Sequence, residues 1–304
     1  MNFLSIKLFW VLLLWLTGFL PNVLAQQVAT YKFADRDTCS LWMDIYQPRE
    51  EVRKDICVIY VFGGGFIGGS RTAEENVRFF KDMVDRGYTV AAIDYRLGLK
   101  GVKLGVFHLK PAFQAPRIAA EDLISATEYL LNNAKELRIN PHRIALVGSS
   151  AGAITVLHAD NELSNRTAMV KNLPADFRYA AVVSFAGAIL STKGRPKYAA
   201  PPAPTLFFHG TKDKIVVYNK VSIFGKGMYG TKSLVKVFKK KEFPFMVVRY
   251  KGIRHKVATF ARFEAQDQVC DFIDMSVVGK YDNEVDMTIQ NKEFIEKYGQ
   301  KHRR

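Results

Sequence analysis

Hydrophobic and polar positions along the chain predict strands and helices in alternation. Residues 56–62 form a continuous apolar run, which is typical of a strand covered on both faces. Apolar residues recur at helical spacing over residues 119–137, and Thr72 and Glu75 are spaced as a capping box that opens a helix. Further strands are expected over residues 29–33, 40–46, 88–93, 144–147, 179–185, 204–208 and 245–250, and further helices over residues 72–86, 151–159 and 263–277. This order predicts an α/β fold with a mostly parallel central sheet and helices on both faces.

The first 25 residues differ from the rest of the chain. Lys7 is their only charge, residues 8–20 are apolar, and small residues lie where a signal peptidase would cleave. An uncleaved anchor is the alternative, but the apolar run falls short of the roughly 20 residues that a membrane span needs. We therefore expect a secretory signal peptide over residues 1–25, export to the periplasm or outside the cell, and no stable membrane span after its removal.

The last residues also differ in composition. Residues 281–304 are rich in charge, with Phe294 and Tyr298 at helical spacing. This pattern predicts a charged helical tail that follows a single globular domain over residues 26–280.

Charge and cysteine content narrow the possible ligands. The formal net charge of +15 favours anionic partners in general, but the densest basic run, residues 239–241, fits the solvated end of a helix. We therefore expect no nucleic acid partner. Cys39, Cys57 and Cys270 lack the CxxC spacing of a zinc site, which argues against a structural metal. Export would permit a disulfide, whereas the apolar surroundings of Cys57 and Cys270 favour buried free thiols.

Candidate chemistry begins with the sequence GSSAG at residues 148–152, which lies between a predicted strand and a predicted helix. This matches G-x-S-x-G, in which a sharp turn lifts a nucleophilic serine clear of the sheet and the flanking glycines avoid steric clashes. The serine would also stand at a helix N-terminus, where negative charge is stabilised. Ser150 is therefore the candidate nucleophile, and Ser149 receives no role. Plain helix capping is the alternative.

A serine nucleophile needs a base, and the base needs an orienting carboxylate. In this topology the acid should follow the serine and the histidine should follow the acid, each after a later strand. Asp213 is the only carboxylate between Asp176 and Glu242, and His255 is the only later histidine outside the tail. These two residues complete a candidate triad with Ser150. His209 ends a strand and is expected to form hydrogen bonds within its loop rather than to act in catalysis.

Backbone N–H groups must also stabilise a tetrahedral oxyanion. Residues 63–65 are consecutive glycines after a predicted strand, and such a loop can turn its donors into a pocket. The N–H of Ala151 would complete this site. A phosphate-binding loop is the alternative, but the chain has neither a Gly-Lys-Ser/Thr ending nor a G-x-G-x-x-G sequence here.

With these residues, the chain resembles the α/β-hydrolases of the carboxylesterase and lipase group, close to secreted bacterial acetyl and feruloyl esterases. The resemblance covers residues 30–278. It rests on LWMDIYQP at 41–48, GGGF at 63–66, DYRL at 94–97, PHRI at 141–144, GSSAG at 148–152, HGTKD at 209–213 and His255. It implies Ser150, Asp213 and His255 as the triad and the N–H groups of Gly64, Gly65 and Ala151 as the oxyanion hole. Phe62 departs from the histidine that the family usually has before the glycines, which affects the loop more than the chemistry.

The resemblance implies a serine esterase that works through an acyl-enzyme on short-chain or carbohydrate-linked esters and needs no metal or organic cofactor. The acyl and alcohol pockets are expected from residues 97–116, 187–204 and 216–232. A short-peptide hydrolase of the prolyl-oligopeptidase type is an alternative, although those enzymes usually carry a large additional domain. A non-catalytic binding module with a hydrolase-like fold is a second alternative, and a complete triad argues against it.

Overall fold

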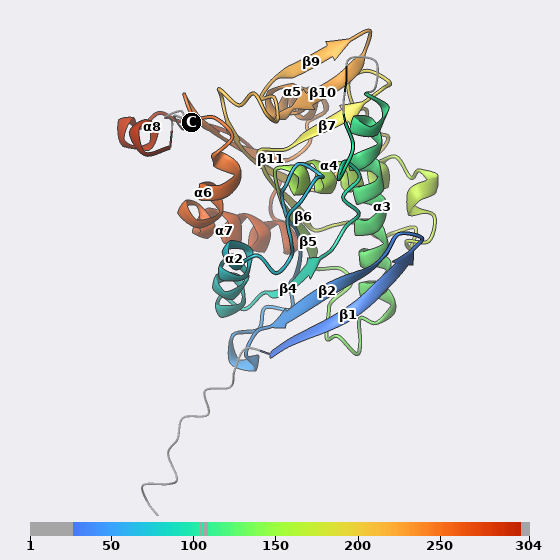
Figure 1. Ribbon diagram of the computed structural model, residues 1–304. Helices are drawn as coiled ribbons and strands as arrows, with labels where there is room; N and C mark the ends of the chain where they lie inside the picture. Colours follow the sequence, from blue (N-terminus) through green and yellow to red (C-terminus); the bar gives the residue numbers. More distant parts are fainter. Residues whose placement is uncertain (1–26, 104, 106–108, 299–304) are drawn as a thin grey trace, which may run out of the picture.

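The structure is a computed structural model that describes residues 27–103, 105 and 109–298 (Figure 1). Its central sheet has the strand order β1-β2-β4-β3-β5-β6-β8-β11-β12. The strands are β1 (Gln27–Arg36), β2 (Cys39–Gln47), β3 (Cys57–Val61), β4 (Thr89–Ile93), β5 (Ile144–Ser149), β6 (Ala181–Phe185), β8 (Thr205–Gly210), β11 (Phe245–Tyr250) and β12 (Glu284–Ile289). The pairs β1–β2 and β2–β4 are antiparallel, and the other neighbouring pairs of this sheet are parallel. The predicted mostly parallel sheet is confirmed.

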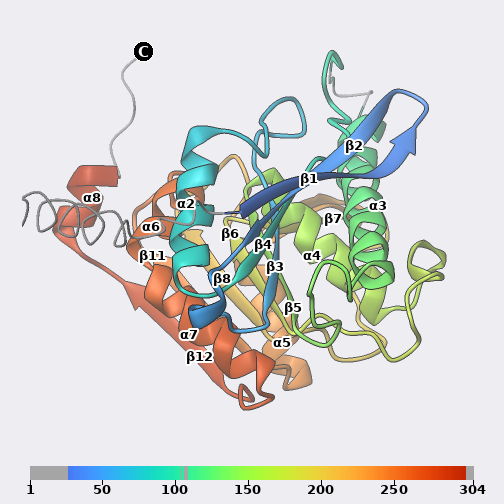
Figure 2. The ribbon, with the colours of Figure 1, turned by 90° about the horizontal axis from the view of Figure 1, so that it is seen from below.

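Helices cover both faces of the sheet, as predicted. They are α2 (Glu74–Asp85), α3 (Lys110–Asn132), α4 (Ala151–Ser164), α5 (Thr231–Lys241), α6 (Val257–Glu264), α7 (Gln266–Val277) and α8 (Lys292–Tyr298), with short 3-10 turns at Glu50–Val52 and Ala168–Val170. Figure 2 shows α2, α6 and α7 on one side of the strands and α3 and α4 on the other. Every residue of β3, β4 and β6 is buried, because these central strands are covered from both sides.

A second sheet was not predicted. It has the order β7-β10-β9, with strands β7 (Ala188–Ser191), β9 (Lys220–Ile223) and β10 (Lys226–Gly230), and it lies beside α5 near the top of Figure 1. Its pairings are antiparallel. Strands this short show too few alternations for a period of two to stand out in the sequence.

Helix α2 begins later than its predicted capping box. Its N-cap is Ala73, which makes no side-chain capping bond, and the Thr72 hydroxyl instead pairs with the Ser70 hydroxyl at 2.7 Å. The predicted capping box is therefore wrong, and the Glu75 side chain is left for other contacts. The predicted helix over residues 119–137 is also displaced, since α3 spans Lys110–Asn132 and carries Pro116 inside it.

The charged tail expected over residues 281–304 is helical only in part. Strand β12 pairs in parallel with β11 from Phe245↔Glu284 to Tyr250↔Ile289, and only α8 after it is helical. The segment after residue 280 therefore adds a strand to the central sheet. The alternation of charged and apolar residues in β12 reflects an edge strand with most of its side chains exposed.

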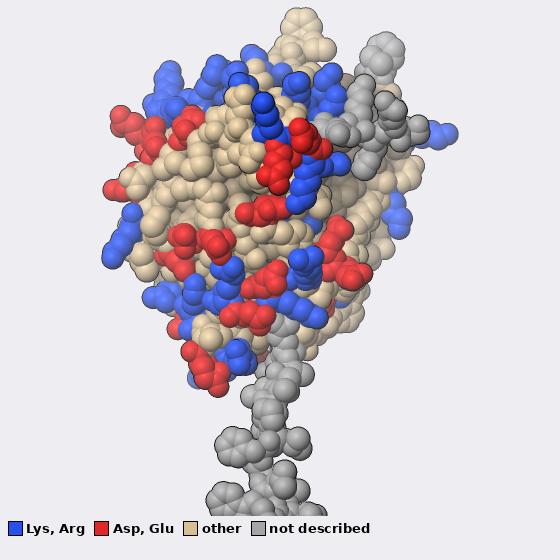
Figure 3. Space-filling view, turned by 90° about the vertical axis from the view of Figure 1, so that its left-hand side faces the viewer, with Lys and Arg blue, Asp and Glu red and all other residues tan. Residues whose placement is uncertain are grey.

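Charged side chains of both signs are interspersed over the face shown in Figure 3, and Lys and Arg gather along its upper edge. Lys239, Lys240 and Lys241 are exposed in the last turn of α5, which confirms that this basic run is a solvated helix end. Lys239 forms an ion pair with Asp286 of β12 at 2.8 Å.

Cys39, Cys57 and Cys270 are free, and the first of them is exposed. The predicted signal peptide over residues 1–25 lies outside the described residues, and within them no helix has the length and apolar character to span a membrane.

Candidate active site

Ser150 occupies a sharp turn between β5 and α4. Its backbone has φ 53° and ψ −115°, a conformation that residues with side chains rarely adopt. A Cβ atom on Gly148 would lie 2.3 Å from the Gly152 carbonyl oxygen, and one on Gly152 would lie 2.0 Å from the Val61 carbonyl oxygen. The two glycines of the motif are therefore required by the close approach of neighbouring backbone, as the sequence predicts.

Contacts outside the motif hold this turn. The Ser150 N–H donates to the Phe185 carbonyl oxygen of β6 at 2.8 Å. The Ser149 hydroxyl donates to the Ala258 carbonyl oxygen of α6 at 2.7 Å and is buried. Ser149 thus has a positioning role that sequence reasoning missed, because its partner lies 109 residues away.

The structure brings Ser150, His255 and Asp213 into one hydrogen-bonded chain. The Ser150 Oγ lies 2.7 Å from His255 Nε2, and His255 Nδ1 lies 2.7 Å from Asp213 Oδ2. When Nδ1 carries the imidazole proton and donates it to the carboxylate, Nε2 is left as an acceptor for the serine hydroxyl. This geometry is the one that proton transfer from the serine requires.

Asp213 is placed to remain a carboxylate. Its Oδ1 accepts the backbone N–H groups of Ile215 and Val216 at 2.9 and 3.1 Å. Burial by itself raises the pKa of Asp213, but hydrogen bonds from His209 and His255 outweigh it and lower this pKa to about 2. A charged acceptor therefore faces His255 throughout the neutral pH range.

His209 lies behind the acid, fully buried, and forms hydrogen bonds within its loop as expected. Its Nδ1 lies 2.8 Å from Thr231 Oγ1, its Nε2 lies 2.9 Å from the Val216 carbonyl oxygen, and the same Nε2 lies 3.4 Å from Asp213 Oδ2. The ring ties the loop that carries Asp213 to the start of α5.

The glycine loop lies beside the nucleophile. A Cβ atom on Gly63 would lie 3.3 Å from the Cβ of Ser150, so the loop passes directly against the serine. Gly64 has φ 129° and Gly65 has φ 65°. Within the described residues, the backbone N–H groups of Gly64, Gly65 and Ala151 have no hydrogen-bond acceptor. These donors are thus available to an oxyanion.

Phe62, which stands where a histidine was expected before the glycines, anchors the loop by packing. Its ring lies 4.5 Å from the ring of Tyr95, centroid to centroid, and its carbonyl oxygen accepts the Tyr95 hydroxyl at 3.0 Å. The far end of the loop is held by Arg71, whose Nε lies 2.9 Å from Asp44 Oδ2 and whose Nη1 lies 2.6 Å from Asp94 Oδ2. The loop is therefore anchored at both ends without a histidine.

Ser150 and His255 line a cavity of about 430 Å³. Its walls come from the glycine loop, the start of α2, the Ser150 turn, and α6 with the loop before it. The lining residues that sequence reasoning missed are Gly69, Ser70, Ala73, Glu75, Asn76, Ile215, Ala258, Thr259 and Arg262. The connections expected to form the pockets do not line this cavity among the described residues: Ile189 and Tyr229 are core residues, and Phe224 is fully exposed.

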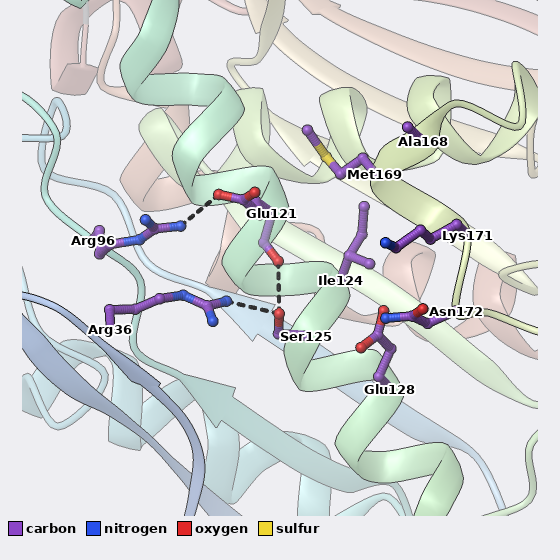
Figure 4. A pocket seen from close by; sticks show the side chains of 10 residues that line it. All are labelled: Arg36, Arg96, Glu121, Ile124, Ser125, Glu128, Ala168, Met169, Lys171 and Asn172. Carbon is purple, nitrogen blue, oxygen red and sulfur yellow. Dashed lines mark hydrogen bonds and ion pairs between the residues drawn. The ribbon is translucent and has the colours of Figure 1, made fainter.

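A second cavity of about 450 Å³ is lined by α3, by residues of the segment 168–172 and by Arg36 and Arg96, and it shares no lining residue with the first cavity (Figure 4). Its arginines are already paired with carboxylates: Arg36 Nε lies 3.0 Å from Asp122 Oδ1, and Arg96 Nη2 lies 2.7 Å from Glu121 Oε2. Asp122 is fully buried, so this cluster binds β1 and the loop after β4 to α3. No group of His, Cys, Asp or Glu suited to a metal ion occurs in the part of the chain that the structure describes.

Part of the chain matches a known protein family and two known enzymes in sequence. The sequence pattern of the BD-FAE family matches residues 43–194, which is half of the chain. Fumonisin B1 esterase of Sphingopyxis macrogoltabida is 29% identical over 123 residues, which are 37% of this chain and 21% of that protein. Ethyl acetate hydrolase of Pseudomonas putida is 25% identical over 139 residues, which are 45% of this chain and 39% of that protein. The matches thus span less than half of the length of these relatives.

Solved structures share the fold over most of the chain. Thermogutta terrifontis esterase 2 phosphoramylated by tabun has a TM-score of 0.58 at 20% identity, covering 84% of this chain and 97% of that one. The butyrate-bound form has a TM-score of 0.57 at 21% identity, covering 87% and 98%. Together with the nucleophile turn and the parallel sheet, these matches establish that the chain is an α/β-hydrolase and belongs to the BD-FAE family.

Proposed function

We propose that the protein is a serine-dependent carboxylic ester hydrolase. One observation carries this proposal: the Ser150 hydroxyl, the His255 imidazole and the Asp213 carboxylate are joined by two 2.7 Å hydrogen bonds, and Ser150 and His255 line a cavity. The activities named for the two relatives, fumonisin B1 esterase and ethyl acetate hydrolase, support the same reaction class.

The proposed reaction passes through an acyl-enzyme. Ser150 Oγ attacks the ester carbonyl carbon while His255 Nε2 takes the hydroxyl proton, and Asp213 stabilises the imidazolium that forms. The N–H groups of Gly64, Gly65 and Ala151 stabilise the tetrahedral oxyanion. His255 then returns the proton to the leaving alkoxide, and a water activated by the same ring releases the acid.

Hydrolysis of 4-nitrophenyl acetate and labelling by a fluorophosphonate test this reaction. We expect Ser150→Ala to abolish labelling and to lower kcat by a factor on the order of 10⁴ or more. Ser40→Ala is the matched control, since it removes an exposed hydroxyl that does not line the cavity and should leave both labelling and kcat unchanged. An unlabelled and inactive wild-type protein would instead favour a non-catalytic binding module.

We propose short-chain or carbohydrate-linked acyl esters as the substrate class. The cavity of about 430 Å³ suits a small acyl group, and the activity named for one relative, ethyl acetate hydrolase, supports a short-chain ester. The rates of hydrolysis of acetyl, butyryl and feruloyl esters and of short peptides should be measured on one preparation. This comparison decides between an esterase and a short-peptide hydrolase. Faster cleavage of the peptides would reject the ester proposal.

We also propose export, with cleavage of a signal peptide after Ala25. Lys7 and the apolar residues 8–20 support it. Expression of the full chain in a bacterial host is expected to yield a periplasmic or extracellular protein whose first residue is Gln26. Recovery of the protein with its original N-terminus in the membrane fraction would favour an uncleaved anchor.

A further inference from the structure

Arg262 brings a buried positive charge to the wall of the active-site cavity. Only 2% of this α6 residue is exposed. Its Nη1 donates to the Tyr60 hydroxyl at 2.5 Å and to Asn76 Oδ1 at 2.6 Å, and its Nε lies 3.5 Å from the Thr259 carbonyl oxygen. These partners are neutral, so they orient the guanidinium without balancing its charge.

The remaining nitrogen, Nη2, has only a distant anionic partner. The nearest carboxylate in the described part of the chain is Glu75, whose Oε1 lies 4.0 Å away and whose side chain is 66% exposed. The arginines of the second cavity differ, because Arg36 and Arg96 both contact the fully buried Asp122 at 3.0 Å or less. A buried charge without a close counter-ion is costly, so an anion brought to Nη2 would be stabilised.

The position of Arg262 places this charge within reach of a bound ester. Arg262 lines the same cavity as Ser150 and His255. It lies one helical turn, about 6 Å, after Ala258, and long helical side chains point back toward the N-terminus of their helix. Its Nε lies 3.5 Å from the carbonyl oxygen of Thr259, which lines the same cavity.

We propose that Arg262 binds an anionic group of the substrate, so that esters carrying a carboxylate close to the scissile bond are preferred over neutral esters of equal size. Glu75 pairs loosely with Arg262 in the free protein and yields to the substrate anion. This inference rests on the proposed esterase function and specifies its substrate class.

Matched ester pairs test the preference on both sides of the scissile bond. On the acyl side, 4-nitrophenyl hemisuccinate is compared with its neutral methyl ester; on the alcohol side, 4-acetoxybenzoate is compared with 4-acetoxybenzamide. The measured quantity is the ratio of kcat/KM for the anionic ester to that for the neutral ester. We expect a ratio above one in at least one pair, with the difference mainly in KM, because a remote ion pair stabilises ground state and transition state alike.

Two variants and a control assign the preference to this site. Arg262→Gln is expected to lower the ratio by roughly tenfold or more, since a charge-assisted hydrogen bond is lost. Glu75→Gln removes the competing carboxylate at an exposed position and is expected to raise the ratio by roughly twofold to fivefold. Glu74→Gln is the matched control, because the exposed Glu74 precedes it in the same helical turn and does not line the cavity. It should leave the ratio unchanged.

Glu75→Gln keeps the proposal testable if Arg262→Gln fails to fold after losing its bonds to Tyr60 and Asn76. Hydrolysis of the neutral esters with no anionic preference in either pair, or ratios that stay constant in folded Arg262→Gln and in Glu75→Gln, would overturn the proposal. Arg262 would then only support the packing of α6 against α2 and β3. Absence of all ester hydrolysis would instead reject the esterase function, so the two failures are distinguishable.

Discussion

Ser150 holds its hydroxyl in a backbone conformation that glycine adopts far more readily than any other residue. Strain of this kind costs roughly 1 to 3 kcal/mol and persists because the surrounding contacts impose it. Here the N–H of Ser150 is tied to Phe185, and the next residue begins α4. The nucleophile therefore carries a stability cost that its position in the turn explains.

This strain predicts an order of stability among inactive variants. Both Ser150→Gly and Ser150→Ala lose the hydroxyl, but only glycine relieves the strained backbone. After allowance for the greater freedom of glycine in the unfolded chain, Ser150→Gly should be more stable than Ser150→Ala by about 1 kcal/mol. Urea unfolding of the two variants measures the difference. Equal midpoints would show that the turn is unstrained.

The glycine loop provides a second test, because two adjacent glycines have different surroundings. A Cβ atom at Gly64 would lie 2.0 Å from the Gly68 carbonyl oxygen, whereas at Gly65 nothing lies within 4 Å. We expect Gly64→Ala to displace the loop and lower kcat by roughly 100-fold or more, as loss of an oxyanion donor does. Gly65→Ala should cost only about 1 kcal/mol of stability for its left-handed backbone. Comparable kcat values would place the oxyanion donors elsewhere.

At the scale of single elements, α4 buries two titratable side chains that the reaction does not use. Burial lowers the pKa of His158 to about 4, and its Nε2 accepts the Leu190 N–H at 3.0 Å. Burial raises the pKa of Asp160 to about 7, although the Ala203 N–H opposes this shift. Both groups are therefore neutral in the folded protein near pH 5.5.

These shifts have opposite effects on stability. The lowered pKa of His158 makes the free energy of unfolding fall as pH decreases from about 6.5 to about 4, because the unfolded chain binds the proton first. The raised pKa of Asp160 makes it fall as pH increases from about 4 to about 7, because the unfolded chain loses the proton first. Between about pH 4 and 6.5 the two effects change the free energy of unfolding in opposite directions, so the pH dependence largely cancels in the wild-type protein.

Single substitutions on α4 should reveal the two opposite changes of the free energy of unfolding with pH. Between pH 4.5 and 6.5, the stability of Asp160→Asn should rise with pH, whereas that of His158→Gln should fall. Urea unfolding at several pH values measures both, with the wild-type protein as the reference. Parallel profiles for all three proteins would contradict the assignment of these pKa values.

At the scale of the whole molecule, the chain returns after α7 to complete the sheet. Strand β12 covers the edge of β11, and Asp286 pairs with both Lys239 of α5 and Arg249 of β11. Helix α8 then packs on α6, where the ring of Tyr298 stacks on Phe260 with centroids 4.1 Å apart. The last part of the chain therefore supports the helix that carries Arg262.

Removal of residues 282–304 tests this role. The truncated chain should melt several degrees lower and self-associate, because the unpaired edge of β11 is a template for another strand. Thermal unfolding and light scattering measure the two effects. Asp286→Asn is a milder comparison that weakens the ion pairs and keeps the strand. A truncated chain that stays monomeric with an unchanged melting temperature would contradict a structural role for β12.

The sequence by itself determined the strands from β1 to β6, β8 and β11 with the helices between them, the GSSAG turn and the identities of Ser150, Asp213 and His255. The elements and the turn follow from local patterns, because hydrophobic periodicity and glycine spacing involve only residues close together in the chain. The acid and the histidine follow from the order in which this fold places its catalytic residues. Tertiary structure alone decided that β12 joins the sheet, that His209 and Ser149 support the site, and that Arg262 reaches the cavity. The physical reason is that these contacts join residues far apart in the chain, as in the bond between Arg262 and Tyr60 across 202 positions, and packing rather than local pattern selects such partners.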